Sequence, residues 1–299
     1  MAFKYYRCID SSSWQSSVNI QINSKNIRKL KSFVSNSSQI IFEENIDLYH
    51  MFRADKTNCG DWWSLPAHYF TFPSESQVVE INDYTNEQLK SGSIIIGGGR
   101  LIGPAFKQLE FLLAQKNIKK IGWGLGNNML DNKKTGYVSH SVPFPKYVEN
   151  FDLLGVRDYI HGYRWVPCAS CMHPAFSKKY EIKHDIVIFE HKRIPINIKG
   201  FPKLNNTGND IEKILSFLGS AETVITNSYH GAYWAILLGR KCIVFHFSSK
   251  FYGFKHKPSI GQIHEWRSLL DKATVHKEAL YESKEANIKF YNDVMKLLM

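Results

Sequence analysis

The chain has 299 residues, a formal net charge of +11 and a hydrophobic fraction of 43%. This length fits one large domain or two of about 150 residues, and the apolar fraction is that of a globular protein. The sequence has no run of about 18 apolar residues that could span a bilayer, and it begins without the apolar block of a secretory signal. We therefore expect a soluble protein in the cytoplasm, either free or at the inner face of the membrane.

The positive charge indicates an acidic partner: nucleic acid, an anionic membrane surface or a phosphorylated small molecule. Basic residues are spread along the chain without a zinc-finger, RNP or homeodomain pattern, so no nucleic acid is expected. The five cysteines are odd in number and scattered, which fits a reducing compartment. Cys168 and Cys171 form one C-x-x-C pair, for which packing is the simpler interpretation, and we predict no metal site.

The predicted elements begin after residues 1–40, an extension rich in Ser, Asn and Lys without obvious chemistry. From residue 41, short apolar runs alternate with longer amphipathic stretches, the pattern of strands and crossover helices in a parallel sheet. Three strands are predicted in this half, each ending in glycine or charge, and open α/β sheets bind ligands at such carboxyl ends. They lie within 93–96, 119–128 and 151–158, with a helix over 104–117.

The second half starts a new cycle after a segment rich in Pro and Cys. Strands are predicted at 185–189, 222–228 and 240–245, helices at 209–221 and 229–239, and amphipathic helices in the last forty residues. The fold class is therefore α/β, with two Rossmann-like lobes and a central cleft. The N-terminal lobe is predicted over 41–165, and the C-terminal lobe with its terminal helices over 166–299.

The segment "TNSYHGAYWAILLG" is the first candidate site. Ser228 can cap a helix whose first turn contains His230 and Gly231, where free backbone N–H groups favour an anion. An imidazole with a reference pKa of about 6.5 can donate or accept a proton there, and the adjacent glycine allows a ligand to approach closely. A histidine that only packs or caps remains the alternative.

Three other segments carry candidate residues. The triplet Gly97, Gly98 and Gly99 lacks both G-x-G-x-x-G spacing and a G-K-[ST] ending, so it is either a tight turn or a ligand-facing loop.

Asn58, Gly60 and Asp61 immediately precede a predicted apolar helix, where capping explains one polar residue but not three. His191 and Lys192 follow the strand at 185–189 and would face the cleft, either as acceptor or donor contacts or in a solvated loop.

The order of these motifs resembles the polysaccharide pyruvyl transferase family, over roughly residues 55–255. The shared features are Asn-x-Gly-Asp before a first helix, a strand into Gly-Gly-Gly, a strand ending Val-Arg-Asp, and Ser-Tyr-His-Gly before a later helix. The resemblance implies a two-lobed fold similar to glycosyltransferases of the B type. It also implies transfer of a pyruvyl group from phosphoenolpyruvate to two hydroxyls of a surface polysaccharide or its precursor, giving a cyclic ketal.

The resemblance assigns roles to several residues. His230 matches the family's essential histidine, Arg157 looks like its donor-binding arginine, and Lys250 looks like the cation that some members place after the histidine motif. Many members have an Arg before a Leu-His pair, whereas Ser228 and Tyr229 precede the histidine here. The glycine loop, with Asn58, Gly60 and Asp61, would take the sugar side.

The expected partners are phosphoenolpyruvate as donor substrate and a saccharide acceptor, lipid-linked or free, with peripheral contact to an anionic membrane. No metal or organic cofactor is required by this scheme. Two alternatives remain open: a B-type glycosyltransferase that uses a nucleotide-sugar donor, and a non-catalytic saccharide-binding relative.

Overall fold

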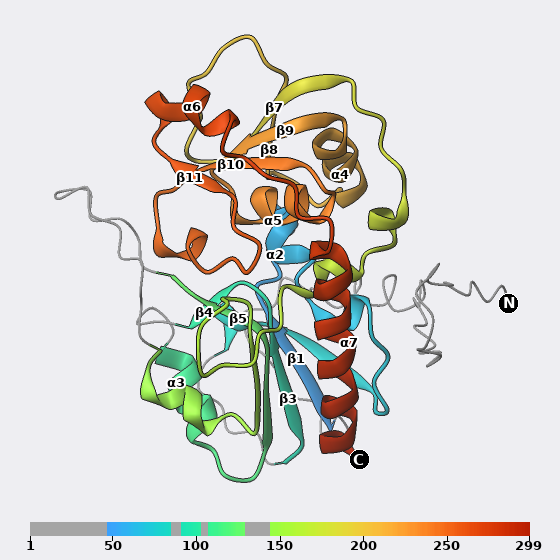
Figure 1. The fold of residues 1–299 in the computed structure, drawn as a ribbon. Coiled ribbons are helices and arrows are strands. Elements are labelled where there is room, and N and C mark those ends of the chain that lie inside the picture. The colour runs from blue at the N-terminus through green and yellow to red at the C-terminus, as the bar shows by residue number, and fades with distance from the viewer. Residues whose placement is uncertain (1–46, 85–90, 103–106, 129–143) are drawn as a thin grey trace, which may run out of the picture.

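A computed structural model describes residues 47–84, 91–102, 107–128 and 144–299, so the predicted extension at 1–40 lies outside the described residues. The described chain is an α/β protein with two separate sheets, one below the other in Figure 1, and every strand pair in both is parallel. The predicted α/β class is confirmed, and the two parallel sheets are compatible with the predicted Rossmann-like fold. No helix among the described residues has the length and apolar character to cross a membrane.

The first sheet has the strand order β2-β1-β3-β5-β4, with β6 also paired to β5. All five residues of β3 are buried, as its β-branched run predicts. The predicted strand at 119–128 does not stop at its glycines, because β5 continues through Gly122 and Gly124 to Asn127. The elements of this part are β1 Leu48–Phe52, α2 Cys59–Trp62, β2 Ser76–Glu80, β3 Ser93–Gly97, β4 Arg100–Ile102, α3 Lys107–Ala114, β5 Lys119–Asn127 and β6 Leu153–Val156.

The second sheet has the order β11-β10-β9-β7-β8, and its predicted strands and helices are confirmed. Asp210 caps α4 by accepting a hydrogen bond from the backbone N–H of Lys213 at 2.9 Å. Buried residues line both faces of this sheet, with α5 against one of them. The elements are β7 His184–Glu190, β8 Lys203–Asn205, α4 Ile211–Gly219, β9 Ala221–Thr226, α5 Tyr229–Leu237, β10 Lys241–Phe245, β11 Ser259–Gly261, α6 Trp266–Leu270 and α7 Ala279–Leu298.

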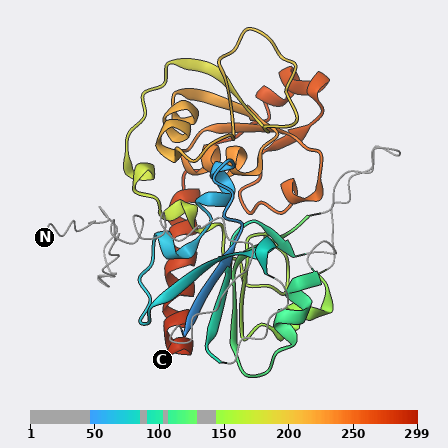
Figure 2. The same cartoon turned by 180° about the vertical axis from the view of Figure 1, so that it is seen from behind.

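The last helix, α7, leaves the second sheet and runs along the first, as Figures 1 and 2 show from opposite sides. Trp123 of β5 packs edge-on against Phe290 of α7 and donates its indole N–H to Oδ1 of Asn287 at 2.8 Å. Asn287 is fully buried, and its Nδ2 donates to the backbone carbonyls of Pro167 and Ser283. The terminal helix of the predicted C-terminal lobe therefore contacts the sheet of the predicted N-terminal lobe.

The segment that crosses between the sheets contains the C-x-x-C pair. Cys168 and Cys171 are buried free thiols, and burial raises the pKa of both. The hydroxyl of Tyr233 donates to the carbonyl of Cys168 at 3.0 Å, and Asn287 Nδ2 lies 3.3 Å from Cys171 Sγ. The segment around the two cysteines is therefore packed between α5 and α7 and contacts both helices.

Asn287→Ala tests how much this network stabilises the docked helix. The substitution leaves the Trp123 indole N–H and the Pro167 carbonyl without their partner in a dry environment, so the free energy of unfolding should fall by about 2–4 kcal/mol. Urea unfolding measures the loss. Asn292→Ala, at an exposed site on the same helix, should change it by less than about 0.5 kcal/mol, and equal effects would contradict the assignment.

Candidate functional site

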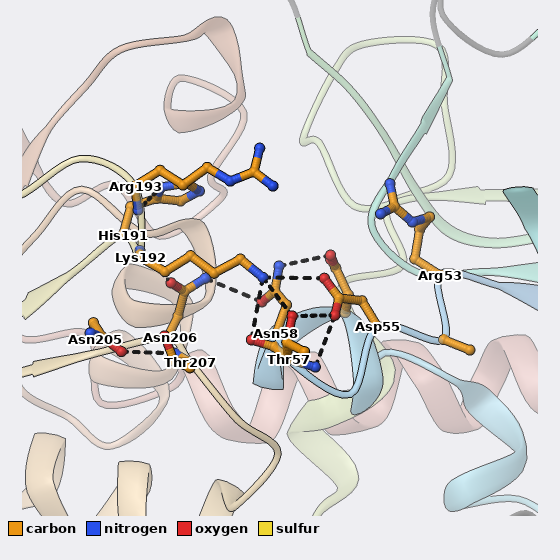
Figure 3. Close-up of polar contacts among 12 residues, drawn as sticks. Arg53, Asp55, Thr57, Asn58, His191, Lys192, Arg193, Asn205, Asn206 and Thr207 are labelled. Atoms are coloured by element: carbon orange, nitrogen blue, oxygen red, sulfur yellow. Dashed lines mark hydrogen bonds and ion pairs between the residues drawn. The ribbon is translucent and has the colours of Figure 1, made fainter. Parts of the chain in front are cut away.

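The loops after the strands of both sheets meet at the junction between them. Asn58, after β1, forms an isolated bridge with Thr207, after β8. The backbone N–H of Cys59 donates to the carbonyl of Asn206 at 3.3 Å, and that of Gly208 to Thr57 at 3.1 Å. Figure 3 shows these two loops facing each other. The junction therefore gathers the carboxyl ends of parallel strands, where such sheets carry their sites.

His230 lies where the sequence predicts, in the first turn of α5. The Ser228 hydroxyl caps this helix by accepting from the backbone N–H of Gly231 at 3.4 Å. The imidazole is buried, and its Nε2 has no hydrogen-bond partner among the described residues. Burial, followed by the positive charges of Arg157 and Lys250, lowers the pKa of His230 to about 3. At neutral pH the ring is uncharged.

Arg157 brings a buried cation beside this ring. It follows β6, it is 3% exposed, and its guanidinium carbon lies 4.0 Å from the ring centroid of Tyr229. Its Nε is 3.7 Å from Oδ1 of Asp158, while Nε and Nη2 have no hydrogen-bond partner among the described residues. Gly126 admits this side chain, because a Cβ there would lie 2.6 Å from Nη2. A planar guanidinium with unsatisfied donors is suited to a carboxylate or phosphate.

The helix after Asn58 begins earlier than the sequence predicts. Gly60 and Asp61 lie within α2 rather than before it, and the Asn58 side chain makes no capping hydrogen bond. Instead Asn58 Nδ2 donates to Oδ2 of Asp61 at 2.8 Å, and Asn58 Oδ1 accepts from Asn206 at 3.2 Å. Burial of the carboxyl is the main cause that raises the pKa of Asp61.

Gly60 is the point at which α2 contacts His230 of α5. A Cβ at this position would lie 2.8 Å from Cε1 of His230 and closer still to Nδ1, so only glycine leaves room for the ring. The imidazole of α5 therefore rests on the backbone of α2.

The triple glycine packs against the segment that follows α2. A Cβ at Gly97 would meet Pro66, and one at Gly98 would meet Ser64. Gly98 and Gly99 have φ of +72° and +76°, conformations that favour glycine. Gly99 is the member that faces the site, since a Cβ there would lie 3.7 Å from Oδ1 of Asp61.

Lys250 and His191 also lie at the junction. Lys250 follows β10, and its Nζ is 4.7 Å from the ring centroid of Phe247, against which His191 packs edge-on. Burial and then the charge of Lys250 lower the pKa of His191 to about 4. The backbone N–H of His191 donates to Oδ1 of Asn227 at 2.7 Å. The structure thus gathers Arg157, Lys250, His191 and His230 around one junction.

A second group of polar residues surrounds Lys192, which the sequence analysis places beside His191 at the cleft. Lys192 Nζ contacts Asp55 Oδ2 at 3.3 Å and Thr57 Oγ1 at 2.9 Å across the junction, and Arg53 and Arg193 flank this contact in Figure 3. Arg53, Asp55 and Thr57 follow β1, a strand that the sequence did not predict, so their position at a sheet edge was missed.

Comparison with protein-family models finds no match for the chain, and none of the curated proteins matches it.

The lowered pKa of His230 predicts a pH effect on stability. The unfolded histidine binds a proton below about pH 6.5 and the folded one does not, so acidification favours unfolding. From pH 6.5 to 5 this group should remove about 1.5–2 kcal/mol from the free energy of unfolding. Between pH 6.5 and 5 the free energy of unfolding of His230→Gln should therefore fall by about 1.5–2 kcal/mol less than that of the wild type, as measured by urea titration at each pH. The exposed His264→Gln is the control, and an unchanged pH slope in His230→Gln would contradict the assignment.

Gly60→Ala should displace the imidazole. Alanine is a better helix former than glycine, so a decrease in the free energy of unfolding would result from the clash with His230. We expect a decrease of about 1–3 kcal/mol. His230→Ala removes the clashing ring, so in that background the same substitution should cost little. A double-mutant cycle by thermal or urea unfolding measures this coupling, and additive effects would contradict the proposed contact.

Proposed function

We propose that the chain is a polysaccharide pyruvyl transferase, which moves a pyruvyl group from phosphoenolpyruvate to a saccharide acceptor and forms a ketal. The observation that supports this most is the buried, uncharged imidazole of His230 at a helix N-terminus, beside Arg157 with its unsatisfied donors and near Lys250. This set combines a proton-transfer group with two cations, as a dianionic donor substrate requires.

The anion-binding part of the proposal rests on three groups. Phosphoenolpyruvate carries a carboxylate and a phosphate. Arg157 can hold one of them with two parallel hydrogen bonds, and Lys250 with the positive end of the α5 helix dipole can hold the other. The negative charge would oppose the effect that Arg157 and Lys250 have on His230, so donor binding raises the pKa of the imidazole towards the working range.

The chemistry assigned to His230 follows from its uncharged state. The ring can take the proton from an acceptor hydroxyl as its oxygen bonds to C2 of the donor, and can deliver that proton to the methylene carbon, which becomes a methyl group. A second hydroxyl then attacks C2, the bond from C2 to the phosphate oxygen breaks, and the second hydroxyl proton leaves with inorganic phosphate, which completes the ketal. Asp61, whose raised pKa makes it a better proton carrier than a surface carboxylate, and Asn58 face the same junction.

The architecture proposed for this function is the two-lobed arrangement of B-type glycosyltransferases, supported by two parallel sheets whose strand-end loops meet. A nucleotide-sugar glycosyltransferase is the second candidate, favoured by the further basic residues Arg53, Lys192 and Arg193 at the junction. The saccharide acceptor is lipid-linked or free, and the proposed location is the cytoplasm or its membrane face.

Ligand-dependent thermal stability separates these functions. Phosphoenolpyruvate should raise the melting temperature of the wild type, because it binds the folded state, and nucleotide sugars should not. Arg157→Ala should weaken this binding at least tenfold, a loss of about 1.4 kcal/mol. Arg267→Ala, at an exposed cation, should leave it unchanged. Stabilisation by nucleotide sugars alone would favour the glycosyltransferase, and by saccharides alone the non-catalytic relative.

His230→Ala and His230→Gln should retain donor binding yet lose turnover by a factor on the order of 10² to 10⁴. The measurement is phosphate release from phosphoenolpyruvate with a panel of saccharide acceptors. A folded His230→Ala protein with normal turnover would contradict the catalytic assignment.

A further inference from the structure

We propose that His256, His276 and Glu278 form a zinc-binding site that joins the start of α7 to the loop between β10 and β11. His256 belongs to that loop, and His276 and Glu278 directly precede α7. One ligand atom from each of the three lies within 4.8 Å of the others. Two imidazoles and one carboxylate are a ligand set that Zn²⁺ uses in proteins.

The surroundings of the two histidines support this assignment. Nε2 of His276 lies 3.0 Å from the backbone carbonyl of Lys257, which can only accept, so this nitrogen carries the proton. Nδ1 of His276 then keeps its lone pair. A ring N–H donated to a backbone carbonyl is the usual outer support of a metal-bound histidine.

His256 lies between two carboxylates. Its Nε2 lies 3.0 Å from Oε2 of Glu282 without the geometry of a hydrogen bond, and its Nδ1 lies 3.5 Å from Oε1 of Glu278. A cation between Nδ1 of His256 and Oε1 of Glu278 would be bound by both atoms and would also be attracted by the carboxylate of Glu282. Glu282 is itself fixed by Lys255, whose Nζ is 2.8 Å away.

The geometry requires a small closure. Ligands about 2.0–2.1 Å from a tetrahedral zinc ion lie about 3.4 Å apart. Nδ1 of His256 and Oε1 of Glu278 are already 3.5 Å apart, and the whole set lies within 4.8 Å, so only a small approach of the ligand atoms is needed. The Glu278 side chain is 55% exposed, whereas that of His256 is 10% exposed. Water would complete the coordination.

The consequence of binding is structural. Zinc would fix the first residues of α7 to the second sheet, while Asn287 fixes the middle of the same helix to the first sheet. His256 lines the same small cavity as Arg157 and Tyr229. None of the three proposed zinc ligands belongs to the proposed catalytic set, so zinc binding is measured without reference to transferase activity.

Titration of the untagged full chain with zinc chloride in a calorimeter tests the proposal. One equivalent should bind with a Kd on the order of 1 µM or tighter, and zinc should raise the melting temperature. His276→Ala and Glu278→Gln should each weaken binding at least tenfold, and Glu282→Gln, which acts through His256, by about 10–100-fold. His264→Ala, at an exposed histidine outside the cluster, should bind as the wild type does.

Cobalt substitution identifies the ligands. The Co²⁺ protein should show the visible spectrum of a low-coordinate nitrogen and oxygen site without a thiolate charge-transfer band. Glu278→Gln changes an exposed side chain, so it tests the site even if His276→Ala were to unfold. Equal zinc affinity in wild type and Glu278→Gln, or a thiolate band in the cobalt spectrum, would overturn the proposal.

Discussion

The burial of Arg157 is the constraint on which the candidate site depends. A guanidinium removed from water is costly unless it is paired and hydrogen-bonded. Among the described residues, the face of Tyr229, a carboxylate oxygen of Asp158 at 3.7 Å and the carboxylate of Asp61 offset the charge of Arg157. The remaining cost must be met by the packing of the two sheets. An anionic ligand would accept hydrogen bonds from Nε and Nη2 of Arg157, which have no partner among the described residues. The buried guanidinium therefore lowers the stability of the free protein and favours the binding of an anion.

That packing depends on elements far from the site. Arg157 belongs to the first sheet and His230 to the second, so their distance is set by how the sheets dock. The docking is held by the crossing segment around Cys168 and by α7, whose Asn287 bonds to Trp123 of the first sheet. A substitution that weakens these contacts would change the distance between Arg157 and the imidazole of His230, although none of the substituted residues would touch the ring.

The sequence predicted an element correctly where a local residue pattern determines that element. The runs in β3, β7, β9 and β10 are β-branched and bounded by polar residues, and each was predicted within two residues of its observed bounds. His230 was found because Ser228 marks a helix start. β1 was missed because its buried set includes Tyr49 and His50, which do not look like a core strand. The position of α7 could not be read, since an amphipathic helix reveals an apolar face but not the surface that it covers.

The contact between Gly60 and His230 also ties the basicity of the imidazole to the packing of two helices. Gly60 lies in α2, which Figure 1 shows beside α5, and the absence of a Cβ leaves the space that the ring fills. Burial is the main cause of the low pKa of this histidine, so a substitution that moved α2 away from the ring and admitted water would raise its pKa. The proton affinity of the imidazole therefore depends on how closely α2 packs against α5.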